Sequence, residues 1–351
     1  MLLLGAARPR APARVWSVRA FGCPHCANLV FFENSICLRC STKLRFDPER
    51  FELVAVGAVP DASCDCANLE LAGCNWVAPA PGTLCRCCRL TRTRPSDGDA
   101  TGLAAFIVAE RAKRRAIAQL LELELPDLEE GKLAFDLLSS ERERVTTGHA
   151  DGVITIDLAE GDDARREARR IELGEAYRTM LGHLRHELGH FAQPRLLRGE
   201  RDWQAARALF GDDRVDYGEA LERHYSQGPP VDWRSRHVSA YAAMHPWEDW
   251  AETFAHYLHI QDTVGTAAAF GVRVDGPGEG IAAPALHSSP PSEPESAAFA
   301  EVLASWLPLS TVLNAISRSV GRDGLYPFAL APAVIRKLAF VHDRFGALRR
   351  G

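Results

Sequence analysis

The chain has 351 residues and a formal net charge of −5, and 46% of its residues are apolar while 25% are charged. This is the composition of an ordinary globular protein; it excludes a fully disordered chain, and the length suggests about two domains. No stretch reaches the roughly 18 apolar residues that a membrane span requires, so we expect no membrane partner.

Charge and cysteine content divide the chain into two parts. Residues 1–94 contain 12 Lys and Arg against 7 Asp and Glu, whereas the rest of the chain is acidic, and all ten cysteines lie before residue 89. We therefore predict a Cys-rich module over residues 20–94 and a larger domain over residues 101–351. Residues 1–19 lack the long apolar core and cleavage site of a secretory signal, and we expect a disordered extension there.

Two CxxC pairs open the Cys-rich module. Cys23 and Cys26 form the first pair, and Cys37 and Cys40 form the second, with ten residues between the pairs. A CxxC turn directs two thiolates at one point, so two such turns can form a tetrahedral four-thiolate zinc site, the arrangement of a zinc ribbon. Disulfides are the alternative, but no secretion signal accompanies them. Because thiolate ligands require reduced cysteines, we also expect a cytoplasmic location.

A second and less regular set of cysteines follows. We expect it to bind another structural zinc ion through Cys66, Cys74, Cys85 and Cys88. The last two of these residues form a third CxxC, and the first two can supply the remaining thiolates. Pairings that use Cys64 or Cys87 instead stay open, as does a cluster of reduced thiols without a metal.

The region after the cysteines predicts a linker, a helix and strands. Thr91–Ala100 is polar and contains a proline and a glycine, which favours a linker. Leu103–Leu125 has the apolar spacing of a helix, and Pro126 ends it. Leu133–Leu138 is extended or helical, and Gly152–Leu158 alternates as a strand does.

A long helix follows, capped by an aspartate at position 162 or 163 and expected to run to about Phe191. It contains an HExxH motif, His186-Glu187-Leu188-Gly189-His190. Because histidines four residues apart face the same side of a helix, His186 and His190 can bind one zinc ion. Glu187 lies beside that face, where it can take a proton from a zinc-bound water. The motif also occurs by chance on surface helices.

A candidate third ligand lies on another helix, expected from Pro246 to Ile260. Glu248 can bind the zinc ion, and Glu252, one turn further on, can accept a hydrogen bond from a ligand histidine. A solvated acidic face is the alternative. Four aromatic residues in the same segment indicate a largely buried helix, however, and buried carboxylates need a partner or a metal.

The remaining segments predict more helices. We expect helices over Asp202–Phe210 and Tyr217–His224, and two or three over Ala298–Phe345. Residues 273–297 are rich in proline, glycine and serine and predict a flexible loop.

Other histidines have weaker claims to the site. His183 lies one turn before His186 but is poorly placed as a fourth ligand, so we expect it to support the ligands or to pack in the core. His149 and Asp151 are expected to be loop residues, and a position lining the cleft is the alternative. His256 and His259 are expected to pack on the second helix or to support the ligands.

The run Glu248-Asp-Trp-Ala-Glu-Thr-Phe254 resembles the second helix of gluzincin metallopeptidases, in the ExxxE form of the anthrax lethal factor type. That type has a tyrosine seven residues before the first glutamate, where this chain has Tyr241. The resemblance implies that the Tyr241 phenol stabilises the oxyanion during catalysis. Ordinary packing of Tyr241 is the alternative.

From about residue 20 onward, the chain also resembles the bacterial family of zinc-binding metallopeptidases with an N-terminal zinc ribbon. The matching stretches are Cys23–Cys40, Cys74–Trp76, Gly182–His190, Leu209–Asp212, Asp216–Tyr217, His245–Ile260 and Leu325–Phe328. The resemblance implies an α+β fold, with a small Cys-rich zinc-ribbon module followed by a mainly α-helical, zincin-like metallopeptidase domain. One departure is Phe191-Ala-Gln-Pro194, where we expect Pro194 to end the active helix early.

Two functions compete on these observations. The first is a zinc-dependent hydrolase acting on a peptide or protein substrate, with one catalytic and two structural zinc ions and Glu187 as the base. The second is a zinc-ribbon module that binds nucleic acid or protein, with an inactive or structural HExxH site. Its basis is a set of basic residues, Arg39, Lys43, Arg45, Arg86, Arg89, Arg92 and Arg94. A structural zinc site has no use for an adjacent carboxylate, so Glu187 favours the hydrolase. The sequence indicates neither the oligomeric state nor the substrate.

Overall fold

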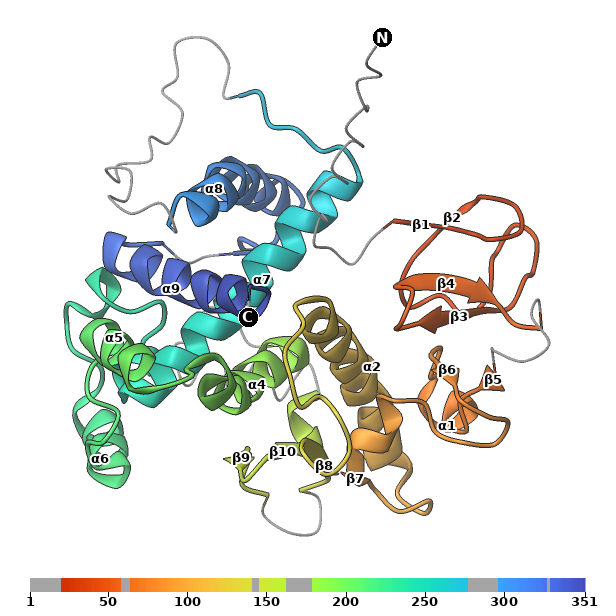
Figure 1. The fold of residues 1–351 in the computed structure, drawn as a ribbon, viewed down its shortest axis with the longest axis horizontal. Coiled ribbons are helices and arrows are strands. Elements are labelled where there is room, and N and C mark those ends of the chain that lie inside the picture. The colour runs from red at the N-terminus through yellow and green to blue at the C-terminus, as the bar shows by residue number, and fades with distance from the viewer. Residues whose placement is uncertain are drawn as a thin grey trace, which may run out of the picture.

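A computed structural model describes residues 20–57, 64–140, 145–161, 179–276, 296–326 and 329–350. Three predictions lie wholly or mostly outside these residues: the extension over 1–19, the first part of the long helix before Thr179, and the loop over 273–297. In the described residues, the Cys-rich module lies on one side of helix α2, and the other long helices lie on the opposite side (Figure 1).

The Cys-rich module is built from short antiparallel hairpins around a small aromatic core. The ring of Phe46 lies 4.8 Å from that of Phe32 and 5.1 Å from that of Trp76, and all three side chains are buried. A core of this size stabilises a chain segment only weakly, so cross-links between the hairpins matter for its fold. Its elements are β1 (Phe21–Gly22), β2 (Leu29–Val30), β3 (Leu44–Asp47), β4 (Glu52–Ala55), β5 (Cys64–Asp65), α1 (Leu69–Ala72), β6 (Val77–Ala78) and η1 (Cys88–Leu90).

One four-stranded sheet belongs to the larger domain. Its order is β7 (Thr91–Thr93), β8 (Ala134–Leu138), β10 (Val153–Asp157) and β9 (Gly148–Ala150). β7 and β10 run parallel to β8, whereas β9 pairs antiparallel with β10 and forms an edge. The strand predicted within Gly152–Leu158 is confirmed as β10. Its alternate residues Ile154 and Ile156 are buried, as the period of two requires.

Two segments predicted as loop or linker are strands. Thr91–Thr93 forms β7, and Ala100 already begins the next helix, so the linker prediction for Thr91–Ala100 is wrong at both ends. The reason is tertiary: three polar residues become a strand because β8 offers them a parallel partner, and Arg92 pairs with Asp136 on that strand. The loop prediction for His149 is wrong for the same reason, since β10 pairs with it.

Helix α2 (Ala100–Glu122) confirms the helix predicted over Leu103–Leu125. The side chain of Asp99 caps it by accepting a hydrogen bond from the Gly102 amide at 2.8 Å. It packs against α4 (Met180–Leu196), against α1 of the Cys-rich module and against η2 (Leu158–Gly161). It thereby connects the two modules.

The predicted helix with the HExxH motif is α4, and it continues beyond Phe191 and through Pro194 to Leu196. The prediction that Pro194 ends it is therefore wrong. A proline within the last turn removes only the backbone hydrogen bond to the residue four positions earlier, and the surrounding contacts outweigh that loss.

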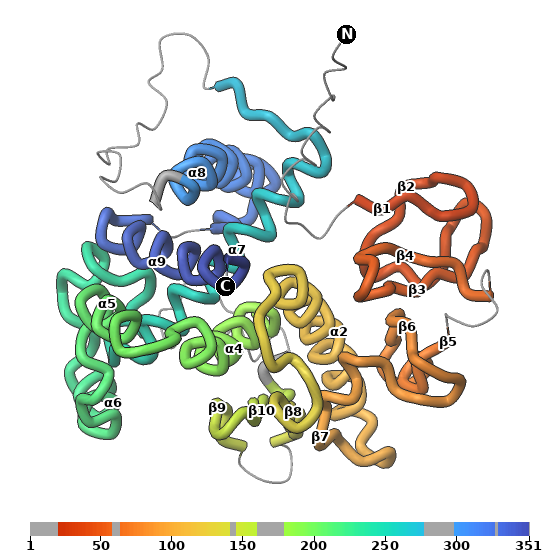
Figure 2. The backbone as a smooth tube through the Cα atoms, viewed as in Figure 1, coloured from red at the N-terminus to blue at the C-terminus, as the bar shows by residue number. Residues whose placement is uncertain are grey.

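The other helices follow the predictions closely. The helix expected over Pro246–Ile260 extends further, as α7 (Pro246–Ala269). Figure 2 follows α7 from its start beside α4 and α5 to its far end beside α8. The remaining elements are α5 (Glu200–Phe210), α6 (Tyr217–Gln227), η3 (Trp233–Ser235), η4 (Tyr241–Ala243), α8 (Ser296–Ser319) and α9 (Pro332–Leu348).

Among the described helices, α8 alone has the length and apolar composition of a possible membrane span. The segment Ala298–Ser319 has a mean hydropathy of 1.4, and 28% of the tested window is buried. One such helix is weak evidence for a membrane, because a core helix of a soluble protein meets the same criterion. Phe299, Leu303 and Trp306 of α8 are buried.

Candidate metal centre

Three side chains from two helices converge on one point in the larger domain. The ligand atoms of His186 and His190, on α4, and of Glu248, on α7, all lie within 4.8 Å of one another. The two histidine Nε2 atoms are 3.2 Å apart. Glu248 Oε2 lies 3.0 Å from Nε2 of His186 and 3.5 Å from Nε2 of His190.

These separations fit a zinc ion. Ligand atoms about 2.1 Å from a tetrahedral zinc ion are about 3.4 Å from one another. Within the described residues, Glu248 Oε2 is buried and has no hydrogen-bond partner. A buried carboxylate oxygen in that state is costly, and a cation between the three ligand atoms would remove the cost. The triad is therefore a suitable zinc-binding set.

Close packing of α4 against α7 brings the triad together. A Cβ atom at Gly189 would lie 3.0 Å from Cα of Ala251, so only glycine permits this approach without a shift of the helices. Trp250 Nε1 donates a hydrogen bond to the Gly189 carbonyl at 2.9 Å, directly across the contact. The spacing of the two histidines and the glycine between them thus both contribute to the geometry of the triad.

Glu187 lies beside the triad, and its neighbour is His183. The Glu187 Oε1 atom is 3.2 Å from Nε2 of His183, and its Oε2 atom is buried without a hydrogen-bond partner among the described residues. Burial alone would raise the pKa of Glu187, but the His183 contact and the nearby histidines lower it below its usual value. The carboxylate is therefore ionised, and His183 supports it rather than joining the triad.

Glu252 lies behind His186, where the sequence places it. His186 Nδ1 is 2.7 Å from Glu252 Oε1, and Ser239 Oγ donates to Glu252 Oε2 at 2.6 Å. Burial opposes ionisation of Glu252, yet the contact with His186 lowers its pKa to about 2. An ionised Glu252 holds the proton of His186 on Nδ1 and leaves Nε2 free to face a metal.

Tyr241 also borders the site, at the start of η4. Its ring centroid is 6.0 Å from that of His186. Burial and the charge of Glu248 raise the pKa of Tyr241 well above its usual value. The phenol therefore stays protonated and can donate a hydrogen bond.

Eight of the ten cysteines form two clusters of four, and the described residues contain no disulfide. In the first cluster, the Sγ atoms of Cys23 and Cys40 are 3.6 Å apart and those of Cys26 and Cys37 are 3.7 Å apart. Thiolates about 2.3 Å from a tetrahedral zinc ion are about 3.8 Å apart, so this cluster also fits zinc.

The second cluster consists of Cys66, Cys74, Cys85 and Cys88. The Sγ atoms of Cys74 and Cys85 are 3.6 Å apart. Neither Cys64 nor Cys87 joins the cluster, although both stayed open as alternatives in the sequence. Cys87 is fully buried, and burial raises the pKa of its thiol.

The comparisons with known proteins agree with this arrangement. A family model described as "Putative zinc-binding metallo-peptidase" matches residues 102–344, and a zinc-ribbon domain model matches residues 20–99. The chain belongs to this metallopeptidase family. It has an α+β fold, with an N-terminal zinc ribbon and a mainly helical peptidase-family domain.

Relatives from mycobacteria cover almost the whole chain. Uncharacterized proteins of Mycobacterium tuberculosis and Mycobacterium bovis are 49% identical over 334 residues, which is 93% of this chain and 94% of each relative. No solved structure matches the chain.

Tyr217 is a site residue that sequence reasoning did not single out. Its phenol donates a hydrogen bond to Glu248 Oε1 at 2.9 Å. The only sequence signal was its presence in one of the stretches that carry the family resemblance. A tyrosine 31 positions before its partner has no local pattern that would reveal the contact.

The edge strand β9 also approaches the site of the peptidase-family domain. β9 contacts α4, and the ring of His149 lies 6.1 Å from that of Phe191. Burial lowers the pKa of His149, and its Nε2 atom is buried without a hydrogen-bond partner among the described residues. Asp151, which follows β9, is exposed.

The zinc ribbon and α2 share a buried polar contact at the second cysteine cluster. Cys88 Sγ lies 3.9 Å from Oε2 of Glu110, and Lys113 Nζ lies 2.6 Å from Oε1 of the same residue. Arg114 donates to the carbonyl of Ala72 at 3.1 Å, beside Cys74. A four-thiolate zinc site would carry a net charge of about −2. Lys113 and Arg114 both pair with Glu110, so the three side chains together would offset about half of that charge.

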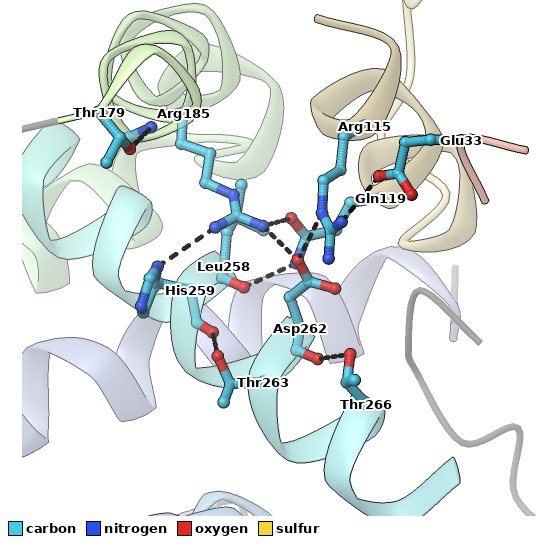
Figure 3. Close-up of polar contacts among 11 residues, drawn as sticks. Glu33, Arg115, Gln119, Thr179, Arg185, Leu258, His259, Asp262, Thr263 and Thr266 are labelled. Carbon is cyan, nitrogen blue, oxygen red and sulfur yellow. Dashed lines mark hydrogen bonds and ion pairs between the residues drawn. The ribbon is translucent and has the colours of Figure 1, made fainter. Parts of the chain in front are cut away.

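A second polar network connects the zinc ribbon with α4, the helix that carries His186 and His190 (Figure 3). Arg185, one residue before His186, donates to Asp262 Oδ2 at 2.7 Å and to Gln119 Oε1 at 2.9 Å. Arg115 of α2 lies 3.3 Å from the same Asp262 oxygen and 3.0 Å from Oε1 of Glu33 in the ribbon. The helices that carry the triad are therefore joined to α2 and to the ribbon through charged groups.

Four of the seven basic residues singled out in the sequence pair with carboxylates. Arg45 is buried and contacts Asp65 at 2.7 Å. The other ion pairs are Arg86 with Glu49, Arg92 with Asp136 and Arg94 with Asp97. Carboxylates of the same chain thus offset the charge of four of the seven basic residues.

Proposed function

We propose that this protein is a zinc metallopeptidase of the gluzincin type, with Glu187 as its base. His186, His190 and Glu248 would hold the catalytic zinc ion, and the two cysteine clusters would each hold a structural one. The observation that carries the proposal is the convergence of the triad beside an ionised, buried Glu187.

Zinc, when bound, would polarise the scissile carbonyl and acidify the attacking water. Glu187 then accepts the proton of that water and later donates it to the leaving amine. Its unpartnered Oε2 atom is the one available for this exchange, because Oε1 faces His183. Glu252 keeps His186 in the tautomer that binds metal, and the protonated Tyr241 would donate to the developing oxyanion.

The substrate class is a peptide or protein, and the proposal places the enzyme in the cytoplasm. Ten free cysteines, eight of them in two metal-compatible clusters, support a reducing compartment.

The test combines zinc content with peptidase activity. Protein purified without chelator should contain three zinc ions per chain, and His190→Ala should contain two, since only the histidine site is affected. Glu187→Gln should keep all three but lose hydrolysis of a mixed peptide library by at least about 10²-fold, as expected for the loss of a general base. Glu301→Gln, an exposed carboxylate on α8, is the matched control. Peptide hydrolysis by the Glu187→Gln variant at the wild-type rate would refute the mechanism.

A further inference from the structure

The two carboxylate oxygens of Glu248 have different surroundings. Oε2 faces the two histidine Nε2 atoms at 3.0 and 3.5 Å, and so lies where a metal would bind. Oε1 accepts the Tyr217 hydrogen bond at 2.9 Å. If Glu248 binds zinc through Oε2 alone, the Tyr217 hydroxyl group satisfies the remaining oxygen, Oε1.

The position of Tyr217 is fixed by contacts at the beginnings of two helices. Tyr217 is the first residue of α6, which Asp216 caps by accepting from the Glu219 amide at 2.7 Å. Its ring lies 5.3 Å from that of His245 and 5.9 Å from that of Trp247.

His245 completes this connection between α6 and α7. Its Nδ1 atom accepts from the Trp247 amide at 3.0 Å and so caps α7. Its Nε2 atom lies 3.1 Å from the carbonyl of Val215, just before α6. The start of α6, with its phenol, is thereby held against the turn of α7 that carries Glu248.

We propose that Tyr217 is a positioning residue that holds Glu248 as a one-oxygen zinc ligand. The proposal rests on the proposed function, since it presumes zinc in the triad. Without the Tyr217 hydroxyl, Oε1 of Glu248 is free to turn toward the metal and fill the position that a catalytic zinc site keeps open for water and substrate. Outer hydrogen-bond partners of this kind typically change metal affinity by about 10–100-fold.

The test is Tyr217→Phe in the full-length protein, which removes one oxygen and keeps the ring packing. The zinc dissociation constant of the histidine site is measured by chelator competition, with both cysteine clusters left filled. We expect about a 10–100-fold weaker site in the variant. The visible spectrum of Co²⁺ bound in the same site should also change, because its absorption reports the coordination number. Tyr225→Phe, an exposed tyrosine on the same helix, is the matched control and should match the wild type in both measurements.

The outcomes separate this proposal from the proposed function. A wild-type histidine site that binds zinc, with the same affinity and Co²⁺ spectrum in Tyr217→Phe, overturns the role of Tyr217 alone. A variant that also loses zinc from the cysteine clusters overturns it too, because the effect would then be general unfolding. A wild-type protein that contains no zinc dependent on His190 overturns the proposed function, and the Tyr217 proposal with it.

Discussion

Removal of the Arg185 side chain tests how much its buried polar contacts contribute to the stability of the packing around α4. Arg185 is only 2% exposed, and its guanidinium bonds Asp262 and Gln119. In Arg185→Met the apolar stem survives, but the buried Asp262 carboxylate loses its closest cation. Breaking a buried ion pair by removing one partner costs about 3–5 kcal/mol.

Because of the contacts drawn in Figure 3, we expect a loss in the free energy of unfolding at the lower end of that range. Asp262 keeps Arg115, whose Nε lies 3.3 Å away, so its charge is not left alone. We therefore expect a loss of about 3 kcal/mol. For a domain of this size, each kcal/mol lowers the Tm by about 2–4 °C, so the Tm should fall by about 6–12 °C.

The assay is thermal unfolding of the zinc-loaded protein, followed by circular dichroism. Arg111→Met, an exposed arginine on α2, is the control and should change the Tm by no more than about 2 °C. The double variant Arg185→Met/Asp262→Leu should recover part of the loss, because no uncompensated carboxylate remains and Arg115 is 28% exposed and can reach solvent. A single variant as stable as the wild type, or a double variant that is strictly additive, would refute the reasoning.

Two further predictions concern packing and pH. Gly189→Ala places a Cβ 3.0 Å from Cα of Ala251, so it should lower the free energy of unfolding by about 1–3 kcal/mol. It should also weaken zinc binding at the histidine site, as measured by chelator competition. Unchanged zinc affinity would show that the spacing between α4 and α7 does not set the geometry of the triad. Burial lowers the pKa of His342 to about 4, so the unfolded chain binds the proton more tightly and stability should fall as pH drops from 6.5 toward 4. Denaturant titrations across that pH range should show that the free energy of unfolding of His342→Gln falls less with acidification than that of the wild type. The same dependence of stability on pH in both proteins would contradict this prediction.

The sequence by itself determined the features that depend on local spacing. Residues four apart on a helix face the same way whatever the helix packs against, so the HExxH motif alone predicted that His186 and His190 lie side by side. The CxxC turns likewise have one geometry, and the first cysteine cluster followed from spacing alone. Glu248 was a candidate ligand because the aromatic residues of its segment predicted a buried helix, in which a carboxylate needs a partner or a metal.

The tertiary structure decided what joins segments distant in the chain. Asp249 is fully buried and contacts Lys337 at 2.5 Å, a partner 88 positions away that no local pattern shows. Strand β7 exists because β8 pairs with it, although its own residues read as a linker. The helix α4 continues through Pro194 because its neighbours outweigh one lost hydrogen bond.

The same distinction applies within the metal centre. Ligand spacing on one helix is a local property, and the sequence showed it. Which phenol supports Glu248, and which arginine anchors α4 behind the site, depend on how α6, α2 and α7 pack. Those contacts arise from burial of whole helix faces, and burial is a property of the assembled chain rather than of any one segment.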